Sequence, residues 1–129
     1  MEPRPPASRL DAVLLASPNP EALAAFYQHG FELEPPKWHG EDHLGLNLSN
    51  TYLGFDRMKE PAPTSSGSIS IRFKVLDIEA TFTRLVRLGA KVKYAPTKEE
   101  SPGEILAMVY DPDGNSVGLI SADSPSPTP

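Results

Sequence analysis

The sequence predicts an α+β fold made of two successive modules, each with the order strand, helix and then three strands. Three observations support this prediction. The order recurs after roughly 58 residues, as expected for an internal repeat. Three of the predicted strands alternate apolar and polar residues, which indicates one buried face. The turn at Asp111-Pro112-Asp113-Gly114 lies between two apolar segments and is typical of a connection between antiparallel strands.

Composition divides the chain into two modules and three proline-rich segments. Apolar residues make up 39% and charged residues 22% of the 129 residues, as in an ordinary globular protein. The segments rich in Pro and Ser have too little apolar surface to be held in a core. We therefore expect a disordered tail at 1–9, a first module at 10–60, a linker at 61–67, a second module at 68–121 and a disordered tail at 122–129.

The first module begins with an apolar strand, Leu10–Ala16, followed by a helix. Asn19 is a good N-cap and Pro20 suits the first helical position, so the helix is predicted over Glu21–His29 and ended by Gly30. Three extended segments are expected to follow it: Phe31–Glu34, His43–Leu48 and Thr51–Asp56.

The second module repeats this order. Ser68–Val75 is predicted as a strand, and Asp77 caps a helix over Ile78–Leu88 that Gly89 ends. The three strands expected after the helix are Lys91–Tyr94, Glu104–Tyr110 and Asn115–Ile120. In the turn before the last strand, Pro112 presets its φ angle, Asp111 can accept hydrogen bonds from the backbone ahead, and Gly114 can adopt a positive φ.

The alternation predicts which side of each strand is polar. Ile69, Ile71, Phe73 and Val75 form an apolar face opposite Ser68, Ser70, Arg72 and Lys74. The strands of the first module alternate similarly, which places His43 with Asn47, and Tyr52 with Asp56, on polar faces. We expect the apolar sides to cover the helices and the polar sides to face solvent or a concave space.

Charge and cysteine content exclude several classes of function. The net charge of −5 disfavours nucleic acid as the main partner, because phosphate binding needs clustered Lys and Arg. With no cysteine, disulfides, thiolate metal sites and a cysteine nucleophile are excluded. No apolar run is long enough to span a membrane, and the start lacks the apolar core of a signal peptide. We therefore expect a cytoplasmic protein without a membrane partner.

The two modules, the Phe26-Tyr27 pair, the two glycines after the helices and the Asp111–Asn115 turn together resemble the vicinal oxygen chelate superfamily. That superfamily includes glyoxalase I, extradiol dioxygenases and bleomycin-resistance binding proteins. The resemblance covers about residues 10–121 and implies curved mixed sheets that form a cup-shaped cavity, often completed by a homodimer.

The resemblance also implies four positions for metal ligands, on the first and last strand of each module. In this sequence they fall on Ala12, Gly54, Ser70 and Gly118, where His, Gln or Glu is usual. None of these side chains is a credible ligand for a divalent metal. We therefore expect no metal and no cofactor. Without the metal, the protein would also lack the usual chemistry of the superfamily, in which the metal polarises two neighbouring substrate oxygens.

Seven residues are candidates for binding a small ligand. Arg72, on the polar face, can hold a carboxylate or phosphate through its planar fork of donors. The alternative for Arg72 is a salt bridge with Asp56 or a glutamate. The exposed indole of Trp38 can cover a planar ligand, although a core or dimer contact is equally consistent with its position. The full set is Trp38, His43, Asn47, Tyr52, Arg72, Met108 and Tyr110, and Met108 can equally belong to the core.

One loop could hold a relocated metal. His39 and His43 lie near Glu41 and Asp42. In an extended chain the two histidines would be about 13 Å apart, so a shared ion would require the loop to fold back. A polar loop that leads into a strand is the alternative interpretation.

These observations favour a metal-independent binding protein of the bleomycin-resistance type, one that sequesters an antibiotic or another organic ligand. The competing hypothesis is an enzyme, a metal-dependent lyase or a dioxygenase-like protein with its metal at His39 and His43. A third interpretation is an interaction module without a small ligand, in which the chain's own side chains fill the cup.

Overall fold

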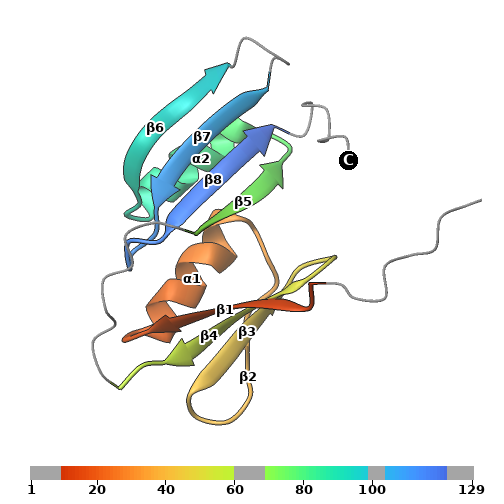
Figure 1. Cartoon of the computed structure of the whole chain (residues 1–129), viewed down its shortest axis with the longest axis vertical. Helices are drawn as coiled ribbons and strands as arrows, with labels where there is room; N and C mark the ends of the chain where they lie inside the picture. The colour runs from red at the N-terminus through yellow and green to blue at the C-terminus, as the bar shows by residue number, and fades with distance from the viewer. Residues whose placement is uncertain (1–9, 60–68, 99–103, 122–129) are drawn as a thin grey trace, which may run out of the picture.

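The structure, a computed structural model, describes residues 10–59, 69–98 and 104–121 (Figure 1). The expected tails and linker lie outside the described residues. The first module contains β1 (Ala12–Ser17), α1 (Pro20–Gly30), β2 (Lys37–Trp38), β3 (His43–Asn47) and β4 (Tyr52–Arg57). The second contains β5 (Ser70–Val75), α2 (Ile78–Arg87), β6 (Lys91–Lys98), β7 (Ile105–Tyr110) and β8 (Ser116–Ser121).

Each module forms one four-stranded mixed sheet with one helix, which confirms the predicted fold class. The strand orders are β1-β4-β3-β2 and β5-β8-β7-β6. The first strand of each module pairs in parallel with the last, β1 with β4 and β5 with β8, and the other pairs are antiparallel. Within the described residues no helix is both long and apolar enough to cross a membrane.

The prediction of a strand over residues 31–34 was wrong. The backbone N–H of Leu33 donates to the carbonyl of Gln28 at 2.9 Å, and Glu32 has a φ of 55°. These features are typical of a Schellman motif, which closes a helix by bonding its last carbonyls. The segment is therefore the C-terminal cap of α1, and the second strand of the module is the short β2.

The two helices end in the same way but with different residues at the left-handed position. Gly89, with a φ of 102°, ends α2 as predicted, and the N–H of Ala90 donates to the carbonyl of Leu85 at 3.0 Å. In α1 this position is occupied by Glu32, and Gly30 is still helical. Gly30 lies where the helices meet, because a Cβ there would be 2.4 Å from Cδ2 of Leu85.

The turn before β8 has the predicted conformation. Gly114 has a φ of 88°, and its N–H donates to the carbonyl of Asp111 at 2.9 Å. Oδ1 of Asp111 accepts from the N–H groups of Asp113 and Asn115, both at 2.9 Å. Its other oxygen accepts from the hydroxyl of Tyr27, at 2.6 Å, so this turn is tied to α1.

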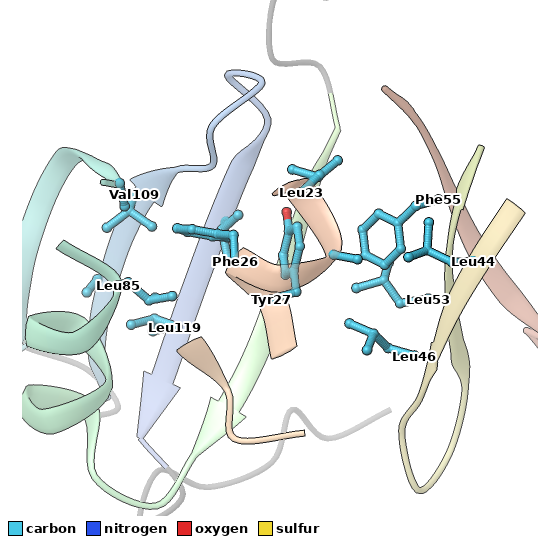
Figure 2. Close-up of a cluster of buried hydrophobic side chains, with 14 of the residues drawn as sticks. Leu23, Phe26, Tyr27, Leu44, Leu46, Leu53, Phe55, Leu85, Val109 and Leu119 are labelled. Atoms are coloured by element: carbon cyan, nitrogen blue, oxygen red, sulfur yellow. The ribbon is translucent and has the colours of Figure 1, made fainter. Parts of the chain in front are cut away.

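The helices and the apolar faces of both sheets share one core. Figure 2 shows side chains of α1 between residues of β3 and β4 on one side and residues of α2, β7 and β8 on the other. Because both sheets direct their apolar faces toward this core, their opposite faces are turned outward. The two polar faces therefore do not face each other within one chain.

Candidate functional site

On the first sheet, three cross-strand pairs of β3 and β4 place the polar candidates in adjacent rows. Asn47 is paired with Tyr52, Gly45 with Gly54, and His43 with Asp56. Directly opposed residues of an antiparallel pair share a face. His43, Asn47 and Tyr52, which the alternation had placed on polar faces, therefore lie together on the outer face of this sheet.

His43 hydrogen-bonds through both of its ring nitrogens. Nδ1 lies 2.6 Å from Oδ1 of Asp56, and Nε2 lies 2.7 Å from the hydroxyl oxygen of Tyr52. The rings of His43 and Tyr52 are also nearly parallel, with centroids 5.9 Å apart and an interplanar angle of 16°. We call these three residues the Asp56–His43–Tyr52 chain.

The middle row of glycines makes room for this chain. A Cβ on Gly45 would be 1.8 Å from the hydroxyl oxygen of Tyr52, and a Cβ on Gly54 would be 2.7 Å from Cε1 of His43. Any side chain at position 45 would displace the tyrosine. The imidazole and phenol rings can therefore lie over the sheet because both positions lack a side chain.

Partial burial and the nearby carboxylate of Asp56 raise the pKa of Tyr52 above its ordinary value. Both effects disfavour the phenolate, because it would be a second negative charge near Asp56 and would lose solvation. The chain nevertheless remains accessible, since the side chains of His43 and Asp56 are 26% and 45% exposed.

On the second sheet, Arg72 and Met108 line a hollow of about 320 Å³ on the outer face. Register places Met108 opposite Gly118, and Gly118 beside Arg72. The aliphatic part of Arg72 lies against Gly118, where a Cβ would be 3.3 Å from Cγ of the arginine. Ser70, Tyr94 and Leu106 also line this hollow.

The guanidinium of Arg72 has no recorded hydrogen bond or ion pair with another of the described residues. The salt bridge to Asp56 that was considered as an alternative is not formed. Asp56 is on the first sheet, where its carboxylate bonds His43, whereas Arg72 is on the second sheet. Tyr110 lies on the same outer face as Met108, opposite Ser116, but it is not among the residues that line the hollow.

Trp38 lies apart from both groups. Its cross-strand partner is the buried Leu44, so its side chain is on the apolar side of the first sheet, and it is 46% exposed. The seven candidates thus fall into three places: His43, Asn47 and Tyr52 on one outer face, Arg72, Met108 and Tyr110 on the other, and Trp38 at the edge.

The residues at the expected metal positions do not fit a divalent metal. Ala12 and Gly54 lie on the outer face of the first sheet, and Ser70 and Gly118 on that of the second. Among these four residues, the hydroxyl of Ser70 is the only side-chain group that could coordinate a metal. Across residues 10–59, 69–98 and 104–121, no group of three His, Asp or Glu residues is placed to hold a metal ion.

The His39 and His43 loop does not gather a ligand set either. Both ring nitrogens of His43 are engaged, and the centroid of His39 is 6.0 Å away. Asp42 lies 3.3 Å from Nε of Arg57, in an ion pair.

Two functional candidates were not singled out from the sequence. Asp56 was identified only as a possible partner of Arg72, although its alternation with Tyr52 already placed both residues on one face. Tyr94 faces the hollow because of irregular pairing between β6 and β7, where the register shifts on both sides of this residue. Alternation could have found Asp56, whereas no local signal predicts the register shift.

Comparison with known proteins agrees with this architecture. The model of the glyoxalase-like domain family matches residues 12–120. No match was found among curated proteins. A glyoxalase/bleomycin resistance protein/dioxygenase family enzyme from Burkholderia phytofirmans PsJN superposes with a TM-score of 0.77 at 19% identity, over 88% of this chain and 98% of the other.

Two further solved structures have the same fold. A glyoxalase-related enzyme from Fulvimarina pelagi gives a TM-score of 0.74 at 21% identity, over 88% of this chain and 87% of the other. A glyoxalase/bleomycin resistance protein from Albidiferax ferrireducens T118 gives 0.73 at 17% identity, over 88% and 99%.

The fold and these matches define a protein of the vicinal oxygen chelate superfamily. Within it, this chain belongs to the glyoxalase-like domain family.

Proposed function

We propose that this protein is a metal-independent binding protein for a small organic molecule that carries a carboxylate or a similar planar anionic group. The observation that carries the proposal is Arg72, whose stem lies against Gly118 in a hollow of about 320 Å³. The resemblance implies a metal-binding glutamate at position 118, and here that place is taken up by the stem of a cation.

The lining of the hollow supports a ligand with an apolar or aromatic body. Leu106 and Met108 offer apolar surface, and Tyr94 adds an aromatic ring to the lining of the hollow. Ligand sites commonly combine apolar walls with a few polar groups that fix orientation. A guanidinium binds a carboxylate through two parallel hydrogen bonds, so Arg72 would set the direction in which the ligand enters.

We further propose that a second copy of the chain covers this face. The outer faces of the two sheets are turned away from each other in one chain, so each hollow is open to solvent. A homodimer that brings an outer face of one copy against its partner would enclose the ligand in a cup. Sequestration of an antibiotic is one role that such a receptor would serve.

Calorimetric titration in the presence of EDTA tests the binding proposal. Benzoate, salicylate, larger aromatic carboxylates and metal-free bleomycin are the probes. We expect at least one carboxylate to bind wild type, and R72Q to weaken it about ten-fold or more, since a charge-assisted pair contributes about 1.5–3 kcal/mol.

R87Q is the matched control, because Arg87 is an exposed arginine in the last turn of α2, outside the hollow. It should bind as wild type does. Equal affinity of R72Q and wild type would contradict the assignment of Arg72. Stoichiometric zinc, nickel, manganese or iron in the purified protein, with binding lost in EDTA, would overturn metal independence in favour of the enzyme hypothesis.

A further inference from the structure

We propose that the Asp56–His43–Tyr52 chain is a proton relay that removes the proton of a ligand hydroxyl bound on the outer face of the first sheet. This site is separate from the Arg72 hollow and does not depend on the function proposed for it. Its ligand would be a small molecule with an acidic hydroxyl group, a phenol or an enol.

The partners decide which atoms donate and which accept in the hydrogen bonds between Asp56, His43 and Tyr52. An ionised carboxylate only accepts, so Asp56 requires the proton of His43 to be on Nδ1. Nε2 then carries the lone pair and accepts from the hydroxyl of Tyr52. With its own proton turned toward His43, the phenol oxygen presents lone pairs to a ligand and recognises a hydrogen-bond donor.

Proteins activate hydroxyl groups with an arrangement of this kind. It consists of a hydroxyl, an imidazole base within hydrogen-bond distance and a carboxylate that orients the imidazole. The raised pKa of Tyr52 is consistent with a phenol that stays protonated at rest and gives up its proton only to His43.

The proton transfer balances without any further reactant. The O–H bond of the ligand breaks, its electron pair stays on the ligand oxygen, and its proton forms a bond to the oxygen of Tyr52. The O–H bond of Tyr52 breaks at the same time, and its proton bonds to Nε2 of His43. The ligand becomes an anion, His43 becomes an imidazolium beside Asp56, and Tyr52 is unchanged.

The surroundings of the chain suit an anionic product. Lys37 is the cross-strand neighbour of Gly45 and therefore lies on the same face, where its ammonium can attract the anion. The ring of His39 is also near, with its centroid 6.0 Å from that of His43. At the Tyr52 end of the chain, Tyr52 and Asn47 also line a shallow hollow of about 280 Å³, beside Asp11 and Thr51, that does not include His43 or Asp56.

Gly45 and Gly54 make room for this geometry in the backbone itself, so it does not depend only on the flexible side chains of His43 and Tyr52. Tyr52 reaches His43 across the row of Gly45 and Gly54, which a methyl group in either place would obstruct. Both rings lie over this row and are nearly parallel, joined edge to edge by their hydrogen bond. The relay is thus held in place before any ligand arrives.

Titration of m-nitrophenol with the protein tests the relay. The absorbance of this probe reports its ionisation, and its pKa is high enough that an ordinary histidine is still mostly neutral one pH unit lower. The measurement is made about one pH unit below the probe's own pKa, where roughly a tenth of the free probe is phenolate. At saturating wild-type protein we expect more than half of the bound probe to be phenolate, about a five-fold increase. Y52F and H43Q should both reduce the phenolate fraction to that of the free probe.

Asp56 is a positioning residue, and D56N tests that role. It should lower the ionised fraction of the bound probe more than it changes the dissociation constant, a separation that a purely structural role would not produce. H29Q, which changes an exposed histidine in the last turn of α1, is the matched control for H43Q and should behave as wild type. Circular dichroism and thermal unfolding of each variant check that it is folded.

The proposal is overturned if wild type does not increase the phenolate fraction, whether because the probe binds in its neutral form or does not bind. It is equally overturned if folded Y52F ionises the probe as well as wild type does, or if R72Q alone abolishes the effect. Retention of carboxylate binding by Y52F would show that a failure here leaves the Arg72 site intact.

Discussion

Asp111 joins local and distant hydrogen bonds in one side chain. The residue is only 4% exposed, and its carboxylate accepts from backbone groups within its own turn and from Tyr27 of α1. Asn115 donates to both of its oxygens, at 3.2 and 2.9 Å. Asp111, a residue type that this turn favours, thus also connects the second module to the helix of the first.

Replacing Tyr27 by Phe should destabilise the protein by about 2 kcal/mol, because a buried hydrogen bond to a carboxylate is lost while the ring is retained. Urea unfolding measures this change. Y94F, which alters a surface tyrosine, should change the free energy of unfolding much less. A Y27F variant as stable as wild type would show that the bond contributes nothing.

The same bond predicts a dependence on alkaline pH. Burial, with a smaller effect from Asp111, raises the pKa of Tyr27 far above its ordinary value of 10.0. The folded state therefore keeps the phenol proton that the unfolded state loses as the pH rises above 10. This stabilisation is complete below that pH and decreases above it, so the stability difference between wild type and Y27F should decrease when unfolding is repeated at rising pH.

At the scale of the elements, the equivalent C-terminal caps of the two helices differ in backbone strain. Glu32 adopts the left-handed conformation that Gly89 adopts after α2. A residue with a Cβ is strained there by about 1 kcal/mol or more. Glu32 also forms an exposed ion pair with Arg84, at 3.2 Å, which offsets part of that strain.

Substitution of Glu32 by Gly should therefore stabilise the protein by about 0.5 kcal/mol, the relief of strain less the entropy of glycine and the lost ion pair. E32Q separates the two effects, since it removes the charge but keeps the Cβ. We expect the order of thermal stability to be E32G, then wild type, then E32Q. A melting temperature of E32G below that of E32Q would contradict the assignment of strain.

The crossing of the helices depends on the absence of a side chain at Gly30. Alanine favours helices over glycine, yet a methyl group at this position would be 2.4 Å from Cδ2 of Leu85. We expect G30A to destabilise the protein by about 1–3 kcal/mol, the usual cost of overpacking. In a double-mutant cycle measured by urea unfolding, the cost of G30A should fall when Leu85 is replaced by Ala, and strict additivity would argue against this contact.

At the scale of the whole molecule, a shared core turns the two outer faces away from each other. Among the residues that the structure describes, nothing from the same copy encloses the Arg72 hollow or the Asp56–His43–Tyr52 chain. Light scattering after size-exclusion chromatography should give twice the chain mass of 14.0 kDa for wild type. A mass of one chain at micromolar concentration, with ligand bound, would show that no second copy is needed.

The sequence was sufficient for features that depend on neighbouring residues. Asn19 and Asp77 accept from the backbone N–H groups of Ala22 and Ala80 and cap the two helices as predicted. Alternation correctly predicted that Ile71, Phe73 and Val75 face the core, although Ile69, placed on the same face, is 77% exposed. The turn at Asp111 has the expected hydrogen bonds. Each of these features is decided within a few residues, by side-chain chemistry and by the period of the strand.

The sequence alone determined two modules, their element order and which residues lie on polar faces. Tertiary structure decided which of those residues meet: His43 with Asp56 and Tyr52, Arg72 with Gly118, Tyr27 with Asp111, and Gly30 with Leu85. The reason is physical. Caps and turns are satisfied by consecutive atoms, whereas these contacts require strand register and a common core, which are settled only when distant segments pack together.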